Sequence, residues 1–148
     1  MGSQCRTRAA VLAAVVLLAG CGGSSRLSHE AFVERANAIC RTYGDAVKRL
    51  RRPQTATEVA PYSERVLPFY RRAVGELAKL RPPARDESTL RALLQSYRVI
   101  ERDLADLAAA GRSGQVARVR DLVRGAAADD RRSSRLARRL GLTVCAAS

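Results

Sequence analysis

The stretch that decides the fold reads LRALLQSYRVIERDLADL and runs from Leu90 to Leu107. Its apolar side chains recur every three or four residues, the spacing that places them on one face of an α-helix. These side chains are Leu90, Leu93, Leu94, Tyr97, Ile100, Leu104 and Leu107. Charged residues fill most of the other positions. The stretch therefore predicts a helix over about residues 85–110 with one side buried against other elements.

Three further segments show the same periodicity. Ser28 is suited to cap the first, because its hydroxyl can accept a hydrogen bond from a free backbone amide. Thr55 and Glu58 have the spacing of a capping box at the start of the second, and Gly141 is suited to end the third. No segment alternates with the period of a strand, so we predict an all-α, four-helix up-down-up-down bundle over residues 28–148. The predicted ranges of these three helices are 28–51, 55–80 and 115–140.

Two of the predicted helices contain interruptions. Pro61 and Pro68 each remove a backbone donor, so we expect the second helix to be bent or broken near one of them. Residues 129–134 of the fourth helix read DDRRSS, which is polar on every side. We expect the helix to fray, kink or project there. Its apolar stripe is expected to begin with Val116, Val119, Val123, Ala126 and Ala127 and to finish with Leu136 and Leu140.

The first 20 residues have the parts of a secretory signal. Arg6 and Arg8 precede an uninterrupted apolar run, Ala9–Ala19. A run of about 11 residues is roughly 16 Å long as a helix, which is too short for a hydrocarbon core of about 30 Å. A cleaved signal over residues 1–20 therefore fits better than a transmembrane helix.

Four residues at the end of this run, Leu18, Ala19, Gly20 and Cys21, resemble the bacterial lipoprotein signal called the lipobox. That resemblance implies a diacylglyceryl group on Cys21 and cleavage before it. Two acyl chains would hold the protein firmly on the outer face of the cell membrane. Residues 21–27 would form a lipidated, flexible tether. The alternative is an ordinary cleaved signal and a free secreted protein.

The cysteines favour one disulfide. Cys5 leaves with the signal and lipid occupies Cys21, so Cys40 and Cys145 remain in an exported chain where thiols oxidise. Their bond would close a loop of roughly 105 residues, which is worth about 4 kcal/mol. A metal site is the weaker interpretation, because two thiols and the single His29 do not supply four ligands.

The position of Cys40 conflicts with an ideal bundle. It lies about 18 Å along the first helix, whereas the end of the fourth helix should lie beside the start of the first. A bond to Cys145 therefore requires one of three arrangements. The tail folds back along the first helix, the fourth helix ends early near Asp129, or the helices are offset.

Three clusters resemble a group of small exported or lipid-anchored actinobacterial helical proteins without an assigned function. They are Phe32-Val33 with Ala36-Asn37, Ile39 and Cys40; Leu77, Leu80 and Pro82-Pro83; and Ala137, Leu140-Gly141-Leu142 and Cys145. The resemblance implies a helical domain closed by a Cys40–Cys145 bridge. It implies no activity.

No catalytic or cofactor-binding constellation is recognisable in the sequence. His29, the only histidine, is expected to be solvated, and so are the pairs Asp86-Glu87 and Asp129-Asp130 unless they serve as cap groups. Asn37 either forms a hydrogen bond across the bundle, for instance to the C-terminal tail, or is exposed. The four tyrosines are expected in the core or at its edge. They are Tyr43, Tyr62, Tyr70 and Tyr97.

The charge is strongly positive, with 27 Lys and Arg against 14 Asp and Glu and a formal net charge of +13. The fourth helix carries much of the excess in Arg118, Arg120, Arg124, Arg131, Arg132, Arg135, Arg138 and Arg139. Such a face suits an anionic lipid or wall polymer outside the cell, where nucleic acid is not an expected partner. A plain solvated surface is the alternative.

Two functions remain open. The first is a non-enzymatic, lipid-anchored module that binds an envelope protein or an anionic polymer through the fourth helix. The second is a binding protein for a small apolar or lipidic ligand held between the helices, suggested by Pro61 and Pro68 because a broken helix can open a bundle core. No metal or cofactor is expected in either.

Overall fold

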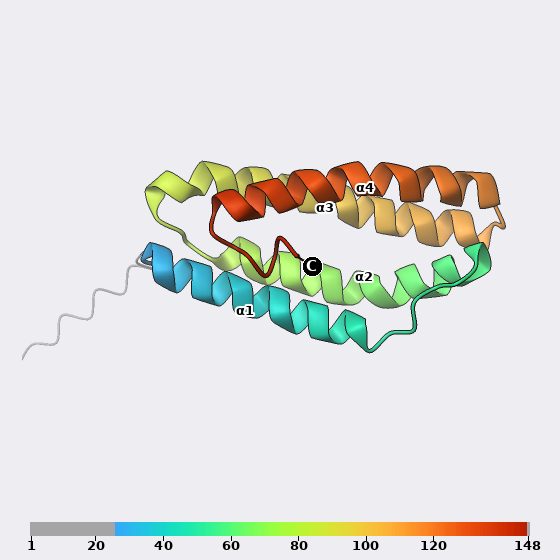
Figure 1. The fold of residues 1–148 in the computed structure, drawn as a ribbon, viewed down its shortest axis with the longest axis horizontal. Coiled ribbons are helices and arrows are strands. Elements are labelled where there is room, and N and C mark those ends of the chain that lie inside the picture. The colour runs from blue at the N-terminus through green and yellow to red at the C-terminus, as the bar shows by residue number, and fades with distance from the viewer. Residues whose placement is uncertain (1–25, 148) are drawn as a thin grey trace, which may run out of the picture.

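The computed structural model describes residues 26–147, which form four antiparallel helices joined by short connections (Figure 1). No strand occurs within these residues. The all-α, up-down-up-down bundle is therefore confirmed, and the helix boundaries lie within a few residues of those predicted. The helices are α1 His29–Lys48, α2 Ala56–Lys79, α3 Ala84–Arg112 and α4 Val116–Arg139.

Local signals account for the ends of three helices. The Ser28 hydroxyl accepts a hydrogen bond from the Ala31 amide at 3.2 Å and caps α1. At the start of α2, the Glu58 carboxylate accepts one from the Thr55 amide at 3.3 Å. After α4, Gly141 adopts φ +76°, and the next amide, of Leu142, donates to the Ala137 carbonyl at 2.9 Å. This glycine cap turns the chain back toward the bundle.

Neither predicted interruption breaks its helix. α2 continues through Pro61 and Pro68, so the expected break is absent. α4 continues through residues 129–134, so the expected fraying or projection of this polar segment was wrong, and Ser133 and Ser134 are buried. Serine is small enough for a close contact between helices. The buried Ser133 hydroxyl has a hydrogen-bond partner, because it donates to the Asp130 carbonyl at 2.9 Å.

The apolar stripe of α4 also differs from the prediction. Val116 and Val123 are 47% and 51% exposed, whereas Val119 is buried. The buried positions that follow the first turns are serine and alanine rather than large apolar residues, so hydrophobicity alone misplaces this face.

The C-terminal tail completes the bundle. After α4 the chain reverses and runs back between α1 and α4 (Figure 1). Among the helices only α2 approaches the backbone of α1 closely. Leu142 is fully buried in the core cluster that α1 shares with the other helices. Of the three arrangements considered for the disulfide, the folded-back tail is the correct one.

The two ends of the bundle have different cores. The main cluster contains residues from all four helices and the tail, including Phe32, Leu77, Leu93 and Leu142. The smaller cluster comes from α2, α3 and α4 alone, because α1 stops at Lys48. Its members are Val59, Leu107, Ala110, Val119 and Leu122.

Candidate functional site

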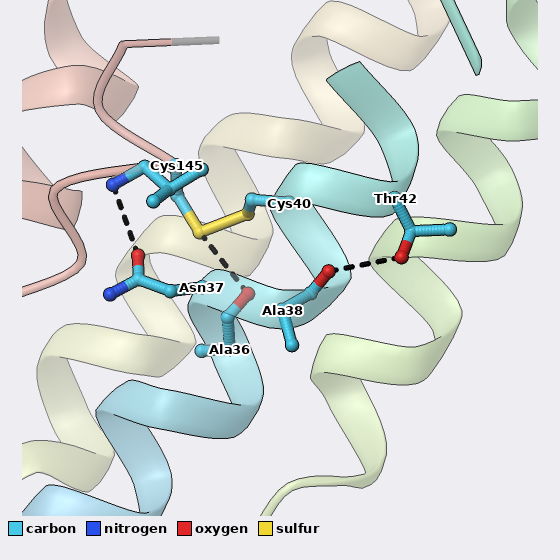
Figure 2. Close-up of a disulfide and its surroundings, with 7 residues drawn as sticks. Ala36, Asn37, Ala38, Cys40, Thr42 and Cys145 are labelled. Atoms are coloured by element: carbon cyan, nitrogen blue, oxygen red, sulfur yellow. Dashed lines mark hydrogen bonds between the residues drawn. A yellow bond between two sulfur atoms is a disulfide. The ribbon is translucent and has the colours of Figure 1, made fainter. Parts of the chain in front are cut away.

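The disulfide joins the middle of α1 to the tail. The Sγ atoms of Cys40 and Cys145 are 2.04 Å apart, and the Cα atoms are 5.1 Å apart (Figure 2). Asn37 lies one turn earlier on α1, and its side-chain oxygen accepts a hydrogen bond from the Val144 amide at 3.0 Å. The structure thus confirms the predicted disulfide, and of the two alternatives left open for Asn37 it shows the hydrogen bond to the tail rather than exposure.

A cavity of about 120 Å³ lies beside this disulfide, in the part of the bundle where all four helices and the tail pack together. All four helices and the tail contribute to its walls, and Asp130 at its edge is the only charged residue among them. The residues that line the cavity are Cys40, Tyr43, Tyr70, Ala73, Val74, Leu77, Tyr97, Ile100, Asp130, Ser133 and Cys145. The cavity is mostly apolar, so a ligand there would need an apolar body.

Three tyrosines from three helices meet at this cavity. The rings of Tyr43 and Tyr70 have centroids 5.6 Å apart and planes at 77°, and those of Tyr70 and Tyr97 are 6.1 Å apart at 83°. Both pairs have the edge-to-face geometry that aromatic rings prefer. Tyr70 and Tyr97 are buried, while Tyr43 and Tyr62 are half-buried, as expected for core and core-edge positions.

Burial keeps these phenols neutral. It raises the pKa of Tyr43 to about 12, with a contribution from Tyr62. It raises the pKa of Tyr97 to about 12, with contributions from Asp130 and Tyr43. The pKa of Tyr70 is raised well above its usual range, again chiefly by burial. The Tyr70 hydroxyl oxygen is buried and has no hydrogen-bond partner within residues 26–147, which is a costly state for a polar group.

The only histidine has a partner that the sequence did not reveal. His29 Nδ1 lies 2.9 Å from Asp86 Oδ2, so the pair links the start of α1 to the start of α3. Glu87 likewise pairs with Arg26 at 2.8 Å. The side chains of His29 and Glu87 remain partly exposed, as expected, while helix packing adds partners nearly 60 positions away that the sequence did not reveal. No group of three or more possible metal ligands occurs in the described part of the chain.

The arginines of α4 are all exposed, and most have no acidic partner. Arg124 is the exception, since it pairs with Asp121. Arg118 lies about 30 Å along the helix from Arg139, so the residues predicted as one surface do not form a single cluster. Four of them border a shallow groove of about 400 Å³ whose remaining walls are Ala92 and Leu136. The four are Arg132, Arg135, Arg138 and Arg139.

This groove, which we call the arginine groove, has no acidic side chain in its walls. None of its arginines forms an ion pair with another residue of the 26–147 segment. Some arginines elsewhere do, as in the pairs Arg26–Glu87 and Arg71–Glu101. The groove can therefore offer several planar guanidinium groups to an anion such as a phosphate.

Comparison with known proteins shows no match to a family model, to a curated protein or to a solved structure. Within residues 26–147, none of the helices is both long enough and apolar enough to cross a membrane. The lipobox at Leu18–Cys21 and the predicted signal lie outside the described residues.

Proposed function

We propose that this chain is a non-enzymatic lipoprotein, anchored through Cys21 on the extracytoplasmic face of the cell membrane, whose arginine groove binds anionic lipid headgroups or a phosphate-rich wall polymer. The observation that carries the binding proposal is the gathering of four unpaired arginines around one groove without an acidic neighbour. Each basic group near a charged membrane surface contributes about 1 kcal/mol. The resemblance to lipid-anchored actinobacterial helical proteins supports the anchor.

The position of the groove favours a partner at the membrane. The start of α1, which follows Arg26 closely in the sequence, and the C-terminal end of α4 lie at the same end of the bundle (Figure 1). Five residue steps separate Cys21 from Arg26, and a chain of that length reaches at most about 18 Å. A lipid on Cys21 would hold this end of the bundle, with Arg138 and Arg139, close to the headgroups.

Binding to vesicles tests the groove. A chain that begins at Gly22 and carries Arg→Glu changes at positions 132, 135, 138 and 139 is compared with the unchanged chain. The control reverses four exposed arginines on α1, the following loop and α2, at positions 35, 49, 52 and 72. Both variants have the same net charge.

We expect the unchanged chain and the control to sediment with phosphatidylglycerol vesicles and not with phosphatidylcholine vesicles. The groove variant should lose roughly a thousandfold in affinity, because four contacts of about 1 kcal/mol each are removed. An equal loss in the control would show that net charge alone drives binding. Retention by the groove variant would exclude the groove as the binding surface.

A second function, binding of a small ligand between the helices, is favoured by the cavity beside the disulfide. The prolines that suggested it do not open α2, so the cavity alone supports it. An engineered cavity of about 150 Å³ binds benzene, so a cavity of about 120 Å³ suits a small molecule rather than a lipid. Mass spectrometry of the natively purified groove variant, which lacks the four arginines that would hold a lipid headgroup, tests this: a small bound molecule supports the second function, and a protein with no bound molecule contradicts it.

A further inference from the structure

We propose that the cavity beside the disulfide binds a small organic cation, an ammonium group with apolar substituents. The proposal rests on the second candidate function and names its ligand class. It is independent of the arginine groove, which lies on the outer surface of α3 and α4 and not in the walls of the cavity.

The aromatic walls are the first observation. Tyr43, Tyr70 and Tyr97 come from α1, α2 and α3, and successive rings stand nearly perpendicular to one another. Aromatic rings attract a cation through their negative faces, and cages of such rings are the usual means by which proteins bind quaternary ammonium groups. The apolar remainder of the wall, with Val74, Leu77 and the disulfide, suits the substituents.

The charge of the walls is the second observation. Asp130 is the only charged side chain that lines the cavity, in a chain whose formal net charge is +13. It forms no ion pair with any residue of the described chain. The nearby Glu101, by contrast, is engaged by Arg71 at 2.7 Å. The walls thus present one carboxylate, which is exposed to solvent and has no ion-pair partner among the described residues, and no cation, which disfavours an anion and favours a positive ligand.

The Tyr70 hydroxyl is the third observation. Its side chain lines the cavity, the residue is only 8% exposed, and its oxygen has no partner among residues 26–147. A ligand that carries a hydroxyl or an N–H group beside its cationic centre would satisfy this oxygen. The class that meets all three observations is a small ammonium compound with a short polar arm.

Choline and 3,3-dimethyl-1-butanol form the test pair, because the second replaces the charged nitrogen of the first with carbon and keeps its shape. The mature protein, with its disulfide intact, is titrated with each while the tyrosine ring signals are followed by NMR. We expect the shifts of these signals to give a dissociation constant for choline at least tenfold lower than that for the neutral alcohol. The Tyr70→Phe variant should bind choline more weakly, since its cavity lacks the hydroxyl.

Two aspartates provide the matched comparison. Asp130→Asn should lower choline affinity about tenfold, whereas Asp129→Asn should leave it unchanged, because Asp129 does not line the cavity. Equal binding of choline and the neutral alcohol would overturn the cation proposal and leave a neutral-ligand site. Absence of binding by both would overturn the second candidate function as well. Equal losses in the two variants would assign the effect to surface charge and overturn the role of Asp130.

Discussion

The side chain of Asn37 accepts a hydrogen bond from the backbone amide of Val144 at 3.0 Å, although 107 positions separate the two residues. The disulfide from Cys40 to Cys145 lies one helical turn further along α1. Together they hold the tail against the helix (Figure 2). Because α1 has close backbone contact with α2 alone among the helices, this tail fastens α1 to the rest of the bundle.

Removal of the disulfide should therefore destabilise the whole bundle. Replacing Cys40 and Cys145 together with serine should lower the free energy of unfolding by about 4 kcal/mol, the value for closing a loop of about 105 residues. Urea unfolding of the variant and the oxidised parent measures the difference. The parent with reductant should resemble the variant, and an unchanged midpoint would show that the tail is held without the bond.

Asn37 should contribute independently of the disulfide. Asn37→Ala removes the hydrogen bond that the Val144 amide donates to the Asn37 side chain and should cost about 0.5–1.5 kcal/mol of stability. Faster hydrogen exchange at that amide measures the local effect. Thr42→Ala is the control, because the Thr42 hydroxyl is exposed and donates at 3.1 Å to the Ala38 carbonyl of its own helix. Similar losses in both variants would contradict the role given to Asn37.

Gly111 permits a close approach of α3 to Ala60 of α2. A Cβ atom built there would lie 2.7 Å from the Ala60 Cβ and 3.0 Å from its backbone nitrogen. Gly111→Ala should therefore destabilise the protein by about 1–3 kcal/mol through overpacking. Gly125→Ala in α4 is the control: its Cβ would meet nothing within 4 Å, so helix propensity should stabilise the protein slightly. A stabilising Gly111→Ala would contradict the close contact.

The tyrosines should make the protein sensitive to alkali. The unfolded chain releases these phenolic protons near pH 10, whereas Tyr43 and Tyr97 have pKa values of about 12 in the folded protein. The folded state therefore holds more protons between pH 10 and pH 12, and its stability must fall as the pH rises through that range. In a pH titration, the tyrosinate absorbance of these residues should rise only above about pH 10, at the same pH at which the protein unfolds. Ionisation of all four tyrosines near pH 10 with the helices intact would contradict this account.

Periodicity and caps in the sequence predicted most of the fold. The stripe in Leu90–Leu107, the Ser28 cap and the Gly141 stop gave helix boundaries close to those observed. The buried face of α4 was misplaced, because Ser133 and Ser134 are polar by type and are buried for their small size. Of the bend or break expected at the prolines, the break does not occur, since α2 is continuous through Pro61 and Pro68.

The sequence predicted less of the candidate sites. Cysteine counting found the pair Cys40 and Cys145, whereas the position of Asn37 beside the apolar stripe left open whether its side chain contacts the tail or is exposed. The cavity depends on where side chains from five segments meet, so no local pattern could reveal it. The same holds for His29 with Asp86 and for the choice of four arginines, out of eight on α4, that share a groove.

The central claim is a lipid-anchored domain closed by one disulfide, and the mass of the intact protein from its native membrane tests it most directly. We predict a chain that begins at Cys21, carries the added mass of a diacylglyceryl group, and gains the mass of two hydrogen atoms on reduction. A chain that lacks the lipid mass would contradict the anchor and leave a secreted protein. A mass unchanged by reductant would contradict the Cys40–Cys145 bond.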